Sequence, residues 1–207
     1  MTKINKVGVE LEGGFNTLSR LNNSMGNFHE DGSVDHFDNC AEKGEFVSIP
    51  LTVDQIEDFI LNNYPTKTNK SCGGHVHVSL KSASDYMDLM SEEFNTFYIQ
   101  EFKKWAEIMG INPRSAFWNR LNGNEVYCKK QFRAIEQRDS NHTNARYCHI
   151  NYCYHEKNRH TVEFRMLPCF QKKTLMLSAV LKTCEIVENY LENFVKTQKI
   201  VSMRIEL

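Results

Sequence analysis

Residues 7–12 alternate strictly between polar and apolar residues, and residues 45–51, 72–80 and 160–168 also have the pattern of strands. Successive side chains of a strand point to opposite faces, so each segment predicts a strand with one apolar face and one polar face. In the third segment, His75 and His77 share the polar face and Val76 shares the apolar face with Val78. Two histidines in this arrangement are either solvated polar residues or ligands of a metal or phosphate.

The polar faces of the other three segments carry carboxylates. Glu10 and Glu12 share one face, Glu45 opens the next strand, and Glu163 lies beside Arg165. Four carboxylates on one sheet face repel one another unless cations or bases offset their charge. Carboxylates with imidazoles suit Mg²⁺ or Mn²⁺, and arginine suits phosphate. The alternatives are a solvated edge strand for the first pair and an exposed ion pair for the last.

Amphipathic periodicity predicts helices that would cover the apolar face, at residues 53–63, 84–110 (one helix or two in tandem), 115–121 and 171–195. Further strands are expected at 146–153 and 200–207, and Asp31-Gly32 is a turn pair that favours a hairpin. Together these elements predict an α+β fold over residues 1–207 as a single domain. Its antiparallel sheet would have an open concave polar face and helices packed on the other face.

The composition indicates where the protein resides and which partners it lacks. No apolar run approaches the roughly 20 residues of a membrane helix, and the start of the chain lacks a signal-peptide pattern. The seven cysteines are irregularly spaced without a Cys-x-x-Cys pair. They predict reduced thiols and a cytoplasmic protein without a membrane partner.

The net charge of −1 conceals an uneven distribution. Residues 1–113 hold 17 acidic and 9 basic residues, whereas residues 114–165 hold 10 basic and 5 acidic ones. A site that holds cations and phosphates together would need such an arrangement, although solvated charged faces also produce it. The aromatic residues of 114–146 are few and irregular, which favours core packing over contact with nucleic acid.

Five of these motifs, taken in order, resemble the amidoligase family. They are Gly8-Val9-Glu10-Leu11-Glu12, Asp31-Gly32-Ser33, Gly44-Glu45-Phe46-Val47-Ser48-Ile49-Pro50-Leu51, Gly74-His75-Val76-His77-Val78-Ser79 and Thr161-Val162-Glu163-Phe164-Arg165. That family belongs to the carboxylate–amine ligase superfamily, with glutamine synthetase and glutamate–cysteine ligase. The resemblance spans about residues 7–167 and implies a catalytic domain like that of glutamine synthetase.

The resemblance also implies metal ligands. In that family one metal bridges the terminal phosphates of the nucleotide. The positions that bind it correspond here to Glu10, His75 and Glu163. Glu12 and Glu45 match the second metal position, nearer the acceptor carboxylate, and either Asp31 or Glu30 is expected to supply a third acid there.

Phosphate and substrate contacts are implied in the same way. His77 and Arg165 match groups that contact phosphate, while Arg146 and Asn151 look like the family's residues for substrate or nucleotide. The implied catalytic residues are Arg165, Glu45 and Arg146, and the implied cofactors are ATP with Mg²⁺ or Mn²⁺. The adenine pocket is not identified.

The implied reaction joins a small-molecule or peptide-like carboxylate to an amine through an acyl phosphate. Two alternatives remain open. One is a phosphotransferase of the same fold, which would need no amine, and the other is a non-catalytic protein that binds metal or nucleotide and interacts with a partner.

Overall fold

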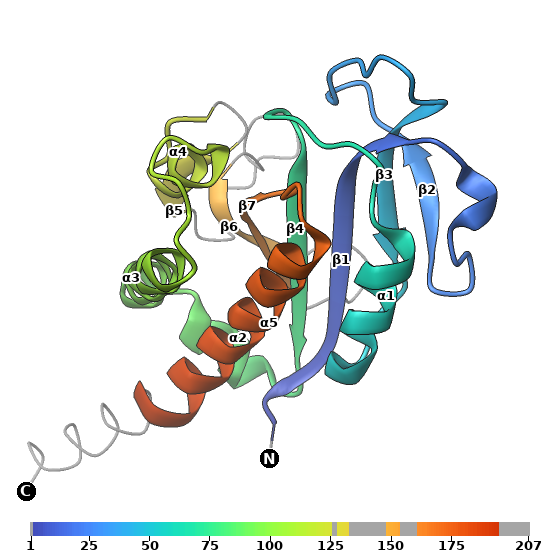
Figure 1. The fold of residues 1–207 in the computed structure, drawn as a ribbon. Helices are drawn as coiled ribbons and strands as arrows, with labels where there is room; N and C mark the ends of the chain where they lie inside the picture. The colour runs from blue at the N-terminus through green and yellow to red at the C-terminus, as the bar shows by residue number, and fades with distance from the viewer. Residues whose placement is uncertain (1, 126–127, 133–147, 154–160, 195–207) are drawn as a thin grey trace, which may run out of the picture.

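The computed structural model describes residues 2–125, 128–132, 148–153 and 161–194 (Figure 1). Within these residues one seven-stranded sheet has the order β2-β3-β1-β4-β7-β6-β5. Its strands are β1 (Ile4–Phe15), β2 (Gly26–Glu30), β3 (Glu42–Ser48), β4 (Gly73–Leu80), β5 (Lys129–Phe132), β6 (Cys148–Cys153) and β7 (Thr161–Pro168). All neighbours pair antiparallel except β5, which runs parallel to β6. The predicted α+β class and antiparallel sheet are confirmed, with β5 as the exception.

Helices cover one face of the sheet, and α1 and α5 cross in front of β1 and β4 (Figure 1). The α-helices are α1 (Ile56–Asn63), α2 (Ala83–Leu89), α3 (Glu92–Ile108), α4 (Ala116–Leu121) and α5 (Lys173–Asn189). Short 3-10 turns lie at Leu18–Arg20 and Val53–Gln55, and a π-helical turn at Tyr190–Phe194 follows α5. None of the helices in the described ranges is long and apolar enough to cross a membrane.

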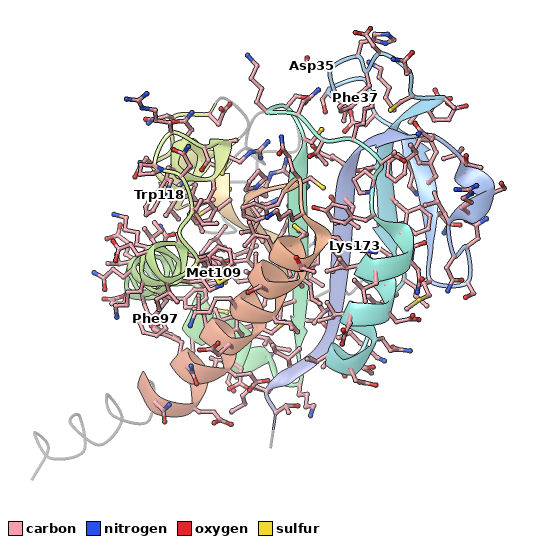
Figure 2. All side chains as sticks on the ribbon, in the orientation of Figure 1. Asp35, Phe37, Phe97, Met109, Trp118 and Lys173 are labelled. Atoms are coloured by element: carbon pink, nitrogen blue, oxygen red, sulfur yellow. The ribbon has the colours of Figure 1, made fainter. Side chains whose placement is uncertain are left out.

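The core lies between this helical layer and the apolar strand faces, where side chains fill the space (Figure 2). Val9 and Val76, on neighbouring strands, are fully buried. The ring of Phe164 stacks on Tyr98 of α3 with centroids 4.6 Å apart. Alternation therefore directs the apolar faces to the helices, as the sequence predicts.

The structure decides between the two alternatives for residues 84–110 and corrects the expected hairpin. Residues 84–110 form two helices in tandem, because Ser91 caps α3 by accepting a hydrogen bond from the Phe94 backbone N–H at 3.1 Å. The Asp31-Gly32 turn is present, and the Asp31 carboxylate accepts from the Ser33 N–H at 2.7 Å. It opens the connection across residues 31–41 and does not form a two-residue hairpin. The strand predicted at 200–207 lies outside the described residues.

Gly73 and Gly74 allow close approaches on opposite faces of β4. A Cβ atom on Gly74 would overlap Met176 Cε and lie 2.9 Å from its sulfur, so this glycine lets α5 pack against the sheet. A Cβ atom on Gly73 would lie 2.6 Å from His75 Nε2 and 3.2 Å from Glu12 Oε2. The glycine pair therefore serves both the core and the polar face.

We expect Gly74→Ala to lower the free energy of unfolding by about 1–3 kcal/mol, because the fully buried Met176 has little room to move away. Chemical denaturation measures this loss. Gly32→Ala is the matched control, since nothing lies within 4 Å of its added Cβ. Equal stability of the two variants would contradict the close packing of α5 on β4.

Candidate metal and phosphate site

The strand register gathers the polar side chains of β1, β4 and β7. Glu10 pairs with His75 across β1 and β4, and His77 pairs with Glu163 across β4 and β7. On the other side of β1, Glu12 pairs directly with Glu45 of β3. Directly paired residues share a face at short distance, so the predicted polar face becomes a continuous row of carboxylates and imidazoles.

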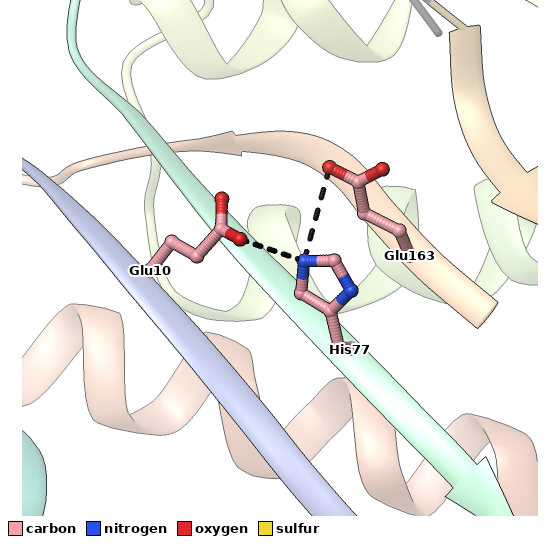
Figure 3. A group of neighbouring side chains, drawn as sticks. All are labelled: Glu10, His77 and Glu163. Atoms are coloured by element: carbon pink, nitrogen blue, oxygen red, sulfur yellow. Dashed lines mark hydrogen bonds and ion pairs between the residues drawn. The ribbon is translucent and has the colours of Figure 1, made fainter. Parts of the chain in front are cut away.

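The first cluster consists of Glu10, His77 and Glu163 (Figure 3). His77 Nε2 lies 3.0 Å from Glu10 Oε1 and 3.9 Å from Glu163 Oε1. One ligand atom from each residue lies within 4.8 Å of the others. Three strands therefore direct an imidazole and two carboxylates toward one point, which a single cation could occupy.

The second cluster consists of Glu12, Asp31 and Glu45, whose ligand atoms also lie within 4.8 Å of one another. Glu12 and Glu45 come from paired strands, and Asp31 comes from the turn that follows β2. Of the two candidates for a third acid, the structure groups Asp31 and not Glu30 with this pair. A set of three carboxylates is the donor type that Mg²⁺ and Mn²⁺ prefer.

His75 lies between the two clusters and is only 4% exposed. Its Nδ1 lies 2.9 Å from Glu10 Oε2, and its Nε2 lies 3.6 Å from Glu12 Oε1. His77 thus joins the compact first group, whereas His75 bridges both groups. The resemblance implies that His75 binds metal and His77 contacts phosphate, whereas the geometry makes His77 the candidate metal ligand beside Glu10 and Glu163. The division of roles between the two histidines stays a prediction.

Two further predicted residues hold Glu163 in place. Arg165 forms an ion pair with Glu163 Oε1, and Asn151 Nδ2 donates to Glu163 Oε2 at 2.7 Å. Both carboxylate oxygens therefore have partners, which orients the group toward His77. Arg146, the remaining predicted site residue, lies outside the described residues.

The charges of the first cluster compensate one another. Burial disfavours ionised Glu10, but its hydrogen bonds with His75 and His77 outweigh that cost and hold its pKa well below the usual value. Burial likewise opposes ionisation of Glu163, yet the charges of His77 and Arg165 lower its pKa. For His77, burial is outweighed by hydrogen bonds with Cys153 and Glu10, so its pKa is raised. A cation binding through this imidazole would have to displace its proton.

The second cluster is compensated less fully. Burial and the negative charges of Glu10 and Glu12 raise the pKa of Glu45 to about 7, and the charge of His75 only partly opposes them. Burial and neighbouring negative charge both disfavour the ionised form of this carboxyl group. This is the part of the sheet face where a cation would relieve the most repulsion.

Two residues of the site were not identified from the sequence. Cys153 Sγ lies 4.0 Å from Glu163 Oε2 and hydrogen bonds with His77. It follows Asn151 by two residues in a predicted strand, so alternation could have placed it on this face. The backbone N–H of Gly73 donates to Glu12 Oε2, a contact that leaves no sequence pattern.

The chain matches no model of a known protein family, no curated protein and no solved structure. The arrangement of its own residues is therefore the basis for any functional proposal.

The raised pKa of Glu45 predicts a pH dependence of stability. The folded state binds this proton more tightly than the unfolded state, whose carboxyl has a pKa near 4.5. The contribution of Glu45 to stability is therefore fully present below that value and is lost as the pH rises to about 7. We expect thermal unfolding of Glu45→Gln to lose this pH dependence, while Glu42→Gln on the same strand retains it. Parallel curves for wild type and Glu45→Gln would contradict the prediction.

Proposed function

We propose that the protein is an ATP- and Mg²⁺-dependent carboxylate–amine ligase. One observation carries the proposal: two clusters of metal-ligand type, Glu10–His77–Glu163 and Glu12–Asp31–Glu45, lie side by side on one sheet face. Adjacent pairs of divalent cations are typical of enzymes that transfer phosphoryl groups. The order of the five sequence motifs favours the ligase among such enzymes.

The donors of both clusters fit hard divalent cations. Five of the six residues are carboxylates, and the sixth is an imidazole, a set that suits Mg²⁺ and Mn²⁺. Such cations would neutralise phosphate charge and orient the transferred group. Arg165, already beside the first cluster, has the planar guanidinium that recognises phosphate oxygens.

The proposed reaction has two balanced steps. A carboxylate oxygen of the substrate attacks the terminal phosphorus of ATP, and the bond to the ADP oxygen breaks. The amine nitrogen then attacks the carbonyl carbon of the acyl phosphate, phosphate leaves, and the nitrogen loses a proton. Positioning and charge neutralisation supply most of the acceleration in such transfers.

Metal binding is the first test. We expect isothermal titration to detect two Mn²⁺ sites, and Glu163→Gln and Glu12→Gln each to weaken one of them by about 10–100-fold. Glu57→Gln is the matched control, because Glu57 is exposed on α1. Unchanged Mn²⁺ binding in both site variants would rule out these clusters as metal sites.

Turnover is the second test. We expect purified protein with ATP and Mg²⁺ to release ADP only when a carboxylate and an amine are both supplied from pools of amino acids and peptides. Glu163→Gln should abolish this release. A stable phosphorylated product without an amine would identify a phosphotransferase. Normal nucleotide binding without ADP release from any pool would favour a non-catalytic protein.

A further inference from the structure

Arg120 of α4 is a buried cation that has no anionic partner among the described residues. It is 4% exposed, and its Nη2 donates to the carbonyl oxygen of Ser71 at 3.2 Å. Its Nε is buried and has no acceptor in the described part of the chain. Across the residues the structure describes, no carboxylate forms an ion pair with it.

Burying a charge is costly unless the charge is paired and hydrogen bonded. Arg120 meets only part of this requirement, because a neutral carbonyl satisfies one of its five N–H donors. The Nε donor and the charge of this guanidinium therefore have no partner among the described residues. An arginine that binds an oxyanion has such a free donor and charge.

The position of this guanidinium relates it to the metal clusters. Arg120 donates to the carbonyl oxygen of Ser71, which lies two residues before Gly73 in the chain. The backbone N–H of Gly73 in turn donates to Glu12. Both Glu12 and Arg120 act electrostatically on the thiols of Cys72 and Cys169. Burial raises the pKa of each thiol, Glu12 raises it further, and Arg120 lowers it. Arg120 thus reaches the end of β4 at which the second cluster lies.

We propose that Arg120 binds a phosphate group at this end of the site, with Nε as a donor to a phosphate oxygen. That this phosphate is the one transferred and released by the ligase rests on the proposed function. Phosphate binding by Arg120 does not rest on it. The planar guanidinium gives charge and directed donors together, which distinguishes it from a lysine at the same place.

Inorganic phosphate is the probe. We expect wild-type protein to bind it saturably in isothermal titration and to show a higher melting temperature in its presence. Arg120→Met should weaken phosphate binding roughly ten-fold or more and lose the thermal shift, and Arg120→Lys should bind with intermediate affinity. Arg114→Met is the matched control, since Arg114 is exposed just before α4. It should behave as wild type.

Two outcomes would overturn the inference: no saturable phosphate binding by wild type, or equal binding by wild type and a folded Arg120→Met. If Arg120→Met fails to fold, the comparison of Arg120→Lys with wild type decides, because a purely structural role predicts equal phosphate affinity for these two.

Mn²⁺ titration separates the phosphate-site proposal from the proposed function. Mn²⁺ binding without Arg120-dependent phosphate binding leaves the proposed function standing, and the reverse result leaves only the phosphate site.

Discussion

Repulsion between carboxylates on one face of the sheet is the constraint around which this molecule is built. Three strands supply Glu10, Glu12, Glu45 and Glu163, and Asp31 joins them from a turn. Bringing such charges together costs free energy that the surrounding structure must offset. Histidines and arginine offset it around Glu10 and Glu163, whereas burial and neighbouring carboxylates raise the pKa of Glu45 to about 7. The uneven compensation identifies where added cations would act.

The rest of the fold builds its core on the opposite face of the sheet. Helices bury the apolar strand faces, so the core is complete without the polar residues. The Gly73–Gly74 pair lets α5 approach one side of β4 while His75 and Glu12 fold close to the other. A rigid sheet held from behind fixes the ligand atoms more precisely than loops would.

Alternation within strands was enough to predict which residues share the polar face, because the two-residue period of a strand fixes side-chain direction. It correctly joined Glu10 with Glu12 and His75 with His77. Strand order and register depend on contacts distant in sequence, so the grouping of His77 with Glu163 needed the structure. The sequence left two candidates, Asp31 and Glu30, for the third acid of the second cluster. No sequence pattern identifies Arg120, because its interest comes from the Nε that has no acceptor among the residues the structure describes.

We propose that this face binds two divalent cations. Crystals grown with Mn²⁺ and measured at the manganese absorption edge test it most directly. We expect two anomalous peaks, one among Glu10, His77 and Glu163 and one among Glu12, Asp31 and Glu45. An ordered sheet face with no anomalous peak at either cluster would contradict it.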